Sequence, residues 1–220
     1  MNSEAEKFAG VDGAKGAWVV ASFDGTTLTW RGCSSVADVL EHTTDCARVG
    51  VDMPLSLPAS GYRISELEAK KFLGPARSSI FHTPVLDVLA AESYPDACAV
   101  SRRITGKAIS KQTWHILPSV EAWRSASFDP DKYVEVHPEC SFRAMSPTTS
   151  FASKKTGRGV GQRMAALERW SEHIDLADLP LGPAVDDFLD AAAAAWSARR
   201  FHLGEHRVFG TADRSDRIVA

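Results

Sequence analysis

The chain has 220 residues, of which 44% are apolar and 24% charged, as is usual for a globular protein. A net charge of −3 does not by itself indicate a nucleic-acid binder, and four cysteines without a C-x-x-C pair argue against a zinc ribbon or a disulfide framework. MNSEAEKFAG lacks the apolar core of a signal peptide, and the longest apolar run, at 191–196, is far shorter than the roughly 20 residues of a membrane helix. We therefore expect a cytoplasmic protein with no membrane segment.

The first third of the chain predicts three strands, a helix and a fourth strand. Short apolar runs at 8–12, 16–23 and 27–33 are typical of an antiparallel meander. SSVADVLEHTTDC has apolar residues at helical spacing behind a capping serine. RVGVDMPLSLP then predicts a buried strand that ends at Asp52 or Met53. Because a helix precedes it, this strand is expected to run parallel to its predecessor in the sheet.

The middle of the chain, from about 61 to 128, predicts a helical insertion. GYRISELEAKKFLG, YPDACAVSRRITG and SKQTWHILPSVEAWRSA all carry helical patterns, and the last is interrupted by Pro118. KYVEVHPECSF at 132–142 alternates apolar and polar residues, which predicts a fifth strand after the insertion.

The last third predicts two helices and a tail. A Ser/Thr/Lys-rich loop at 146–159 leads into GQRMAALERWSEHI, an amphipathic helix, and AVDDFLDAAAAAWSARRF predicts a second helix with a carboxylate-rich first turn. About 205–220 is expected to form a tail, poorly tied after residue 209. The whole chain, 1–220, is expected to be a single domain.

Aspartates stand at positions where a carboxylate needs compensation. Asp12 and Asp52 lie at or near the ends of apolar strands, although aspartate is also common there as a turn former or cap. Asp187 and Asp190 are three apart and share a helix face, whereas Asp186 lies about 100° round from Asp187. The helix dipole accounts for Asp186 and Asp187. It does not account for Asp190, which adjoins the small-residue stretch AAAAAW and would be compensated by a divalent cation.

Carboxylates that converge from two strand ends and a helix predict a site for Mg²⁺ or Mn²⁺, which prefer oxygen ligands. Two such ions roughly 3.5–4 Å apart suit phosphodiester hydrolysis. No nucleophilic side chain is required for that reaction.

A series of motifs follows in order over about residues 9–200: GVDGAKGAW, VGVDMPLSLP, RSSIF at 77–81, TGKAISKQ at 105–112, EVHPECSF at 135–142, SKKTGRG at 153–159 and VDDFLDAAAAAW at 185–196. The series resembles that of the predicted nucleases grouped as domain of unknown function 429, which are similar to ribonuclease H and the bacterial Holliday-junction resolvases. The resemblance implies a ribonuclease-H-like α/β fold. Its mixed sheet would be flanked by helices, with the helical insertion between the fourth and fifth strands.

The resemblance also implies the roles of single residues. Asp12 matches the first-strand aspartate, and Asp52 matches the acidic residue that closes the fourth strand, where the resolvases generally carry glutamate. Asp187, Asp190 and Ala191 reproduce the resolvase D-x-x-D-A pattern of the last helix. These four aspartates are thus the expected catalytic and metal-binding residues, with Mg²⁺ or Mn²⁺ as cofactor and DNA or RNA as substrate.

Further candidates lie around this centre. Glu139 or Glu135 is expected to be an outer catalytic carboxylate, with His137 orienting water or substrate, and Glu139 is preferred because it is taken as the end of the fifth strand. The alternative is an edge strand with a solvated polar face. The stretches 97–120 and 141–167 hold basic but no acidic residues and could contact phosphates, or could be a solvated helix face and a mobile loop. The expected substrate-binding residues are Lys15, Arg77, Ser78, Lys107, Gln112, His137, Lys154 and Lys155.

Other functions remain open from the sequence. DGAKG at 12–16 resembles the first phosphate loop of the actin-like sugar kinases, but those enzymes need two cores, for which 220 residues leave little room. A non-catalytic module that binds nucleic acid or a protein partner would have the same fold and basic surfaces. A homodimer is also left open.

Overall fold

The computed structural model describes residues 6–174, 176, 179–211 and 216–220. The chain divides into two compact units. The sheet unit comprises Met1–Met53, Phe128–Arg207 and Val219–Ala220, and the helical unit comprises Pro54–Ser127 and Val208–Ile218. The helical unit thus begins before the predicted start of the insertion near 61, and it includes part of the predicted tail at about 205–220.

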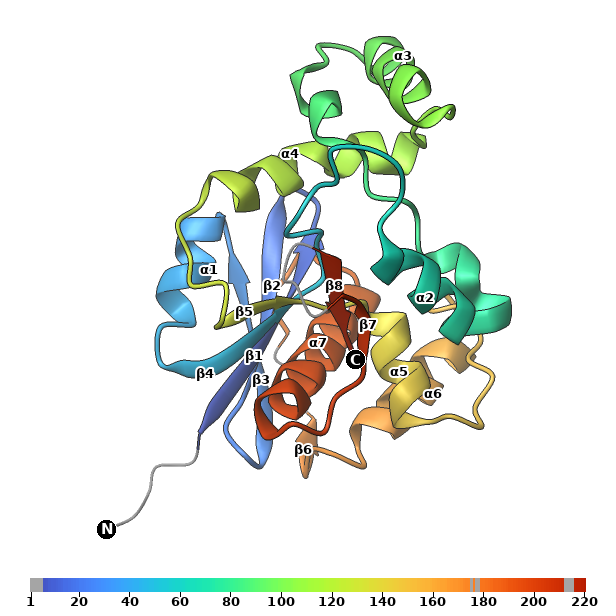
Figure 1. The fold of residues 1–220 in the computed structure, drawn as a ribbon. Coiled ribbons are helices and arrows are strands. Elements are labelled where there is room, and N and C mark those ends of the chain that lie inside the picture. Colours follow the sequence, from blue (N-terminus) through green and yellow to red (C-terminus); the bar gives the residue numbers. More distant parts are fainter. Residues whose placement is uncertain (1–5, 175, 177–178, 212–215) are drawn as a thin grey trace. The chain divides into compact units, whose positions relative to one another are not determined.

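The sheet unit is built on a mixed six-stranded sheet (Figure 1). Its strands are β1 (Lys7–Ala14), β2 (Ala17–Phe23), β3 (Thr27–Cys33), β4 (Cys46–Val51), β5 (Tyr133–Glu135) and β6 (His173–Ile174), in the spatial order β5-β4-β1-β2-β3-β6. The first three strands form the predicted antiparallel meander. β4 pairs in parallel with β1, and β5 pairs in parallel with β4. The crossover through α1 (Val36–His42) therefore carries β4 to the far side of β1 rather than next to β3.

Local chemistry explains the first elements. Lys15 and Gly16, with φ of 46° and 83°, form the two-residue turn between β1 and β2, and such positive φ angles suit the twist of a hairpin. Ser35 caps α1, because its side chain accepts a hydrogen bond from the Asp38 N–H. The predicted capping serine is confirmed.

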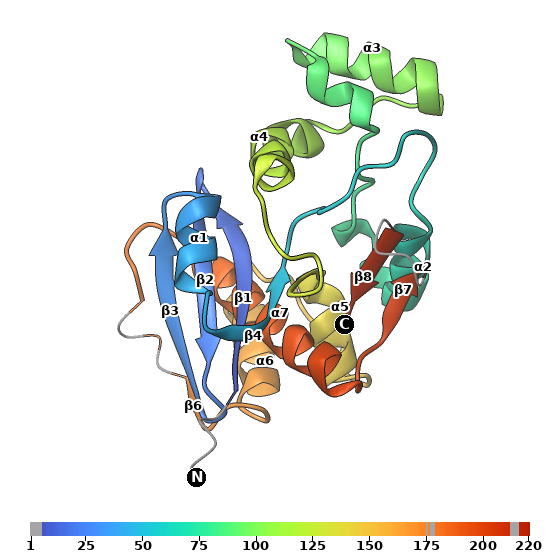
Figure 2. The same cartoon turned by 60° about the vertical axis from the view of Figure 1, so that its left-hand side comes forward.

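The long helix α7 (Val185–Leu203) packs on β1, β2 and β4 (Figure 2). The approach is close because the strands carry glycine at the crossing. A Cβ added to Gly10 would lie 2.0 Å from the Ala191 carbonyl oxygen, and one on Gly50 would lie 2.3 Å from that of Ala194. The alanine run supplies the matching small face, so the backbone of α7 rests almost directly on the strands. This packing fixes where Asp190 stands relative to β1 and β4.

Helices α5 (Pro138–Met145) and α6 (Gly157–Leu167) pack against α7 and correct two predictions. The fifth strand ends at Glu135 instead of continuing to 142, because Pro138 begins a helix, where its missing N–H costs nothing. The helix expected at 161–174 begins at Gly157, capped by Thr156, and ends at Leu167. Its expected second half contains the short strand β6 instead.

The helical unit contains α2 (Ile64–Leu73), α3 (Tyr94–Thr105), α4 (Lys111–Ser125) and the 3₁₀ helices η1 (Gly74–Ser79) and η2 (Leu86–Ala90). β7 (Val208–Gly210) packs against α2 and pairs with β8 (Arg217–Val219). The prediction that Pro118 interrupts this helix is wrong, because α4 continues through the proline. None of the described helices combines the length and the hydropathy that a membrane span requires.

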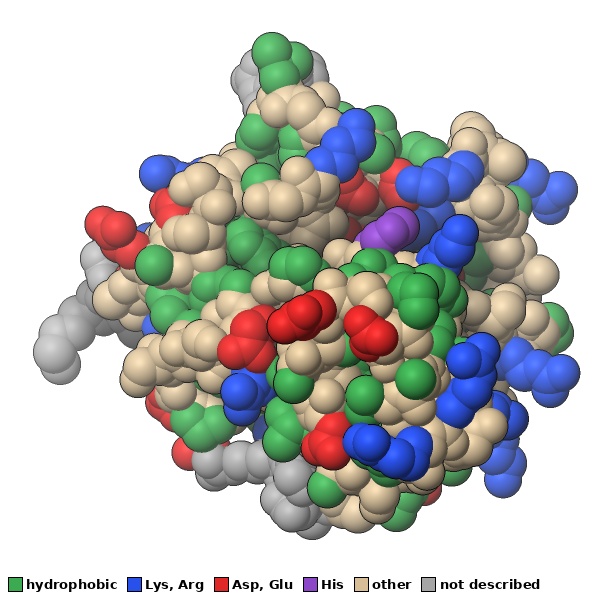
Figure 3. All heavy atoms as spheres, turned by 90° about the horizontal axis from the view of Figure 1, so that it is seen from above, with side chains coloured by type: hydrophobic (Ala, Val, Ile, Leu, Met, Phe, Trp, Pro, Cys, Tyr) green, Lys and Arg blue, Asp and Glu red, His purple; other side chains and the backbone are tan. Residues whose placement is uncertain are grey.

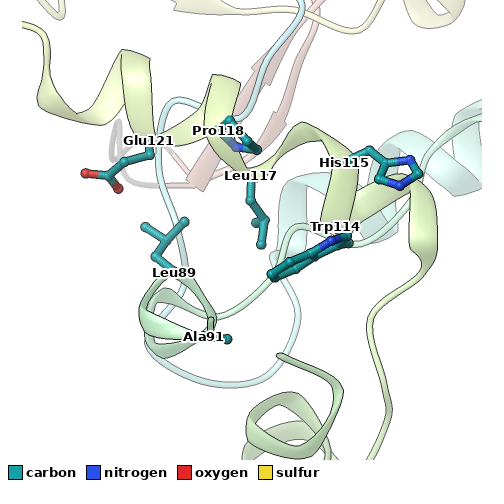
Figure 4. Close-up of a pocket in the computed structure, with 7 residues that line it drawn as sticks. All are labelled: Leu89, Ala91, Trp114, His115, Leu117, Pro118 and Glu121. Atoms are coloured by element: carbon teal, nitrogen blue, oxygen red, sulfur yellow. The ribbon is translucent and has the colours of Figure 1, made fainter. Parts of the chain in front are cut away.

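A pocket of about 370 Å³ lies in the helical unit, between η2 and α4 (Figure 4). Leu89, Trp114 and Leu117 point toward one another across it, whereas the His115 ring points away. The remaining lining residues are Ala91, Pro118 and Glu121. The interior of this pocket is apolar, and it brings together no set of polar groups that could act on a substrate.

The last residues of the chain are held in the structure, contrary to the prediction of a poorly tied terminus. The Arg207 and Ala220 backbones exchange two hydrogen bonds, of 2.6 and 2.9 Å, and Val219 forms a parallel bridge with Val136. Val219 and Ala220 are buried. The expectation is therefore wrong for 216–220, while residues 212–215 lie outside the described part of the chain. Strands of three residues are too short to show a pattern in the sequence.

Candidate acidic metal centre

Three aspartates meet in the sheet unit: Asp12 of β1, Asp52 directly after β4 and Asp190 of α7. One carboxylate oxygen from each lies within 4.8 Å of those of the other two. Asp12 and Asp190 are buried, and Asp52 is partly buried. The three residues come from distant parts of the chain, so the fold rather than a local turn creates the group.

The sheet register explains the meeting of Asp12 and Asp52. Val11 pairs with Val51 in the parallel ladder of β1 and β4, and the Asp52 N–H donates to the Val11 carbonyl oxygen at 2.8 Å. The two aspartates are therefore adjacent at one edge of the sheet, where the functional groups of α/β proteins often gather. Asp190 joins them because α7 lies across these strands.

Burial and mutual repulsion disfavour the ionised form of these carboxylates. Burial, followed by the charges of Asp52 and Asp190, raises the pKa of Asp12 far above its ordinary value. Burial and the charge of Asp190 raise the pKa of Asp52 to about 8. Burial also raises the pKa of Asp190, to about 6, although Lys154 counteracts it. Without a bound cation, the group is therefore short of positive charge.

Lys154 supplies positive charge to this group. Its Nζ donates to Asp190 Oδ2 and lies 3.6 Å from Asp186 Oδ2. Burial alone would lower the pKa of Lys154, but Asp190, Asp12 and Asp52 outweigh burial and raise it above its ordinary value. The neighbouring Lys155 binds Asp186 at 2.6 Å. Both lysines were expected to bind substrate, and in this structure both make ion pairs with aspartates of α7.

The contacts of Asp186 and Asp187 differ from those predicted. Asp187 lies outside the group of three, and its side chain accepts a hydrogen bond from the Ala184 N–H at 2.9 Å, although its charge contributes to the raised pKa of Asp12. Asp186 is buried and binds both lysines. Asp186 was not among the predicted site residues, because it lies about 100° round the helix from Asp187. Its four-residue spacing from Asp190, which places the two on one face of a helix, was the signal that could have found it.

Glu139 lies in the first turn of α5, not at the end of a strand as predicted. Its Oε1 accepts a 2.5 Å hydrogen bond from Nη2 of Arg163, a residue of the basic stretch 141–167 that was expected to contact phosphates or to be solvated. The charge of Glu139 contributes to the raised pKa of Asp190. His137 is the extended residue that precedes α5 and is partly buried.

The remaining predicted substrate-binding residues are exposed. Lys15 lies in the β1–β2 turn of the sheet unit. Arg77 and Ser78 lie in η1, Lys107 follows α3, and Gln112 is in the first turn of α4, all within the helical unit. Figure 3 shows several exposed lysine and arginine side chains on the face that it draws. Their role in binding stays a prediction.

The residues of the centre fit a hard divalent cation. Asp190 Oδ1 is buried and has no hydrogen-bond partner among the described residues, although Oδ2 is bound to Lys154. A buried carboxylate oxygen without a partner is costly, and carboxylate oxygens are the ligands that Mg²⁺ and Mn²⁺ prefer. Asp12, Asp52 and Asp190 together could hold such an ion.

Comparisons with known proteins locate the chain in a family without a defined activity. Neither the curated proteins nor the solved structures contain a match. The family described as "Protein of unknown function (DUF429)" matches residues 10–214, which is nearly the whole chain. This protein therefore belongs to the DUF429 family.

Proposed function

We propose that this protein is a metal-dependent nuclease of ribonuclease-H-like fold that hydrolyses phosphodiester bonds in nucleic acid. The observation that carries the proposal is the group of buried aspartates, Asp12, Asp52 and Asp190, in which one buried oxygen of Asp190 has no partner among the described residues. A folded protein retains such a costly arrangement when a ligand compensates it.

The strand arrangement supports the fold proposed. An antiparallel meander is followed by a parallel strand on the far side of β1, and acidic residues stand on the first strand, directly after the fourth strand and on the last long helix. These are the positions of the acidic residues that the resemblance to ribonuclease H and the resolvases implies. Asp52 is shorter than the glutamate of the resolvases, but its backbone hydrogen bond to Val11 holds it next to Asp12.

Asp12, Asp52 and Asp190 would hold Mg²⁺ or Mn²⁺, with Asp187 nearby. When bound, such an ion acts as a Lewis acid toward the phosphoryl group and lowers the pKa of water. The chain's own part is to present the carboxylates from rigid elements, two neighbouring strands and a packed helix, so that their positions are set before substrate arrives. Lys154 is bound to Asp190, and His137 directly precedes α5, whose Glu139 acts on the charge of Asp190; both side chains are suited to orient a phosphate.

A cleavage assay with matched variants tests this proposal. The protein is freed of metal with EDTA, supplied with Mn²⁺ and incubated with fluorescent single-stranded DNA, duplex DNA, a four-way junction and single-stranded RNA. Asp12→Asn and Asp190→Asn should each reduce cleavage to background, because each removes one carboxylate of the centre. Asp87→Asn, an identical change at an exposed aspartate of η2, should leave the rate unchanged.

The outcomes separate the two functions. Loss of cleavage in both centre variants, with normal cleavage by Asp87→Asn, supports the nuclease. Equal cleavage by wild type and both centre variants assigns the activity to a contaminant and overturns the proposal. Tight binding of a nucleic acid that Asp12→Asn does not weaken, with no cleavage by wild type, favours the non-catalytic binding module.

A further inference from the structure

Lys154 stands between two carboxylates of the same helix face. Its Nζ is bound to Asp190 Oδ2 and lies only 3.6 Å from Asp186 Oδ2. Asp190 belongs to the acidic centre, whereas Asp186, one helical turn earlier on α7, does not. A small rotation about the side-chain bonds of Lys154 would therefore exchange one carboxylate partner for the other.

The backbone that carries Lys154 is firmly held. The Ala152 N–H donates to Gln162 Oε1 at 2.7 Å, and Arg163 Nη1 donates to the carbonyl oxygens of Ala152 and Gly159 at 3.0 and 3.1 Å. The guanidinium of Arg163 is buried, with its centre 5.3 Å from the rings of Phe142 and Phe151. The segment expected to be a mobile loop is thus tied to α5 and α6 through Gln162 and Arg163.

Further contacts fix the same segment from its other end. Thr156 caps α6 through the Gly159 N–H, and its hydroxyl donates to the Ser153 carbonyl oxygen at 2.8 Å. A Cβ on Gly159 would lie 2.0 Å from the Ser153 carbonyl oxygen, so the loop and the helix approach as closely as backbones can. Lys154 is therefore presented to the centre by built structure rather than by a flexible surface loop.

A divalent cation and an ammonium group compete for the same carboxylate. A metal ion bound through Asp190 would face the Lys154 charge at short range inside a poorly solvated site, where like charges repel strongly. Asp186 offers the ammonium another partner within reach. Lys155 also binds Asp186 but makes no ion pair with Asp190 among the described residues, so the exchange concerns Lys154 alone.

We propose that Lys154 is an internal counter-cation of the acidic centre, which holds Asp190 in the metal-free protein and transfers to Asp186 when a divalent cation binds. This inference rests on the metal site of the proposed function, but it does not require that the protein cleave nucleic acid. It assigns Asp186 the role of a receiving carboxylate, which accounts for a buried aspartate outside the metal-binding group. The divalent-cation affinity is then set by a lysine that is not a ligand.

Calorimetric titration of the full-length, EDTA-treated protein with Mn²⁺ tests the exchange. Lys154→Met removes the competing cation and should tighten Mn²⁺ binding about tenfold, which corresponds to about 1.4 kcal/mol. Asp186→Asn removes the receiving carboxylate and should weaken Mn²⁺ binding by a similar factor. Arg158→Met removes one positive charge from the exposed start of α6 and should change the affinity less than twofold, while Lys154→Arg should retain the wild-type affinity.

A measurement on the wild-type protein covers the case in which a variant does not fold. In protein labelled with ¹³C at lysine Cε, a signal assigned by its absence from Lys154→Arg should shift when Mg²⁺ is added, and signals from exposed lysines should not. A Lys154 signal that remains unchanged at saturating Mg²⁺ overturns the proposal.

The Mn²⁺-binding results distinguish failure of the proposed lysine exchange from failure of the proposed nuclease activity. Tighter Mn²⁺ binding by Lys154→Met supports the exchange whether or not nucleic acid is cleaved, and so does binding by this variant where the wild type binds none. Unchanged or weaker binding by Lys154→Met overturns the exchange, even if the wild type is an active nuclease. Absence of Mn²⁺ binding in both wild type and Lys154→Met overturns both proposals.

Discussion

Both units of this protein bury carboxylates, but they compensate them differently. In the helical unit, Glu66 is 2% exposed and both of its oxygens have partners: Oε1 accepts the Thr83 N–H at 2.8 Å, and Oε2 lies 3.1 Å from His82 Nδ1. The buried Arg63 guanidinium lies 3.9 Å from Glu66 and 3.5 Å from Asp216. Opposite charges and donors therefore surround this acid.

In the sheet unit, Asp190 is equally buried, yet one of its oxygens has no partner among the described residues. Lys154 is the cation bound to the group that Asp190 forms with Asp12 and Asp52. Burial is thus the same in the two places, and the supply of positive charge differs. Glu66 is compensated by partners within the protein, whereas the acidic centre could hold a cation from outside.

The largest expected effect is the loss of stability caused by Glu66→Gln. This change removes the negative charge that faces Arg63 and leaves a buried cation with one fewer partner, which should cost about 3–5 kcal/mol of unfolding free energy. Urea denaturation at pH 7 in EDTA measures it, with Glu92→Gln, an exposed residue, as the matched control. A loss below about 1 kcal/mol would show that the Glu66 network is no better compensated than the acidic centre.

Asp52→Asn is expected to increase, not decrease, the unfolding free energy of the metal-free protein. The pKa of Asp52 rises from 3.8 to about 8 on folding, mainly through burial and the charge of Asp190. Well below pH 3.8, the Asp52 carboxyl is neutral in both the folded and the unfolded state and does not affect stability. As the pH rises toward 8, the unfolded chain ionises before the folded one, so the wild type loses stability that the asparagine variant keeps.

Asp52→Asn should therefore stabilise the metal-free protein by about 1–4 kcal/mol at pH 8 and have almost no effect near pH 3. Urea denaturation in EDTA at both pH values measures the difference between the variant and the wild type. Saturating Mn²⁺ should reverse the order at pH 8, since only the wild type keeps all three carboxylates. A variant less stable than the wild type at pH 8 in EDTA would contradict the idea of an uncompensated centre.

Much of this architecture follows from local sequence signals. The strands β1 to β4 and the helices α1 and α7 have regular periodicity, and Ser35 and Gly204 mark helix ends by capping chemistry. Two predictions at prolines were wrong. Pro138 begins a helix within an alternating pattern that predicted a strand, and Pro118 lies inside a helix that it was predicted to interrupt. β6, β7 and β8 have only two or three residues each, and their pairing depends on tertiary contacts.

The centre was accessible to sequence reasoning only in part. Asp12, Asp52 and Asp190 could each be proposed, because a carboxylate at a strand end or on a packed helix needs compensation. Their spacing depends on the register of β1 with β4 and on Gly10 and Gly50, which no periodicity shows. The binding of Lys154 to Asp190 depends on a loop held by Arg163, and a basic, Ser/Thr-rich segment gives no sign of such order.

The smallest expected effects are those of removing two helix caps, one in each unit. Thr156 caps α6 and Ser110 caps α4, each through its hydroxyl, so Thr156→Ala and Ser110→Ala should each cost about 1 kcal/mol of unfolding free energy. Only Thr156 also ties the segment that carries Lys154, through its bond to the Ser153 carbonyl oxygen. Loosening that segment weakens the hold of Lys154 on Asp190, so Thr156→Ala should tighten Mn²⁺ binding a few-fold while Ser110→Ala leaves it unchanged. Calorimetric titration of both variants measures this, and equal Mn²⁺ affinities would show that the order of the loop has no bearing on the charge of the centre.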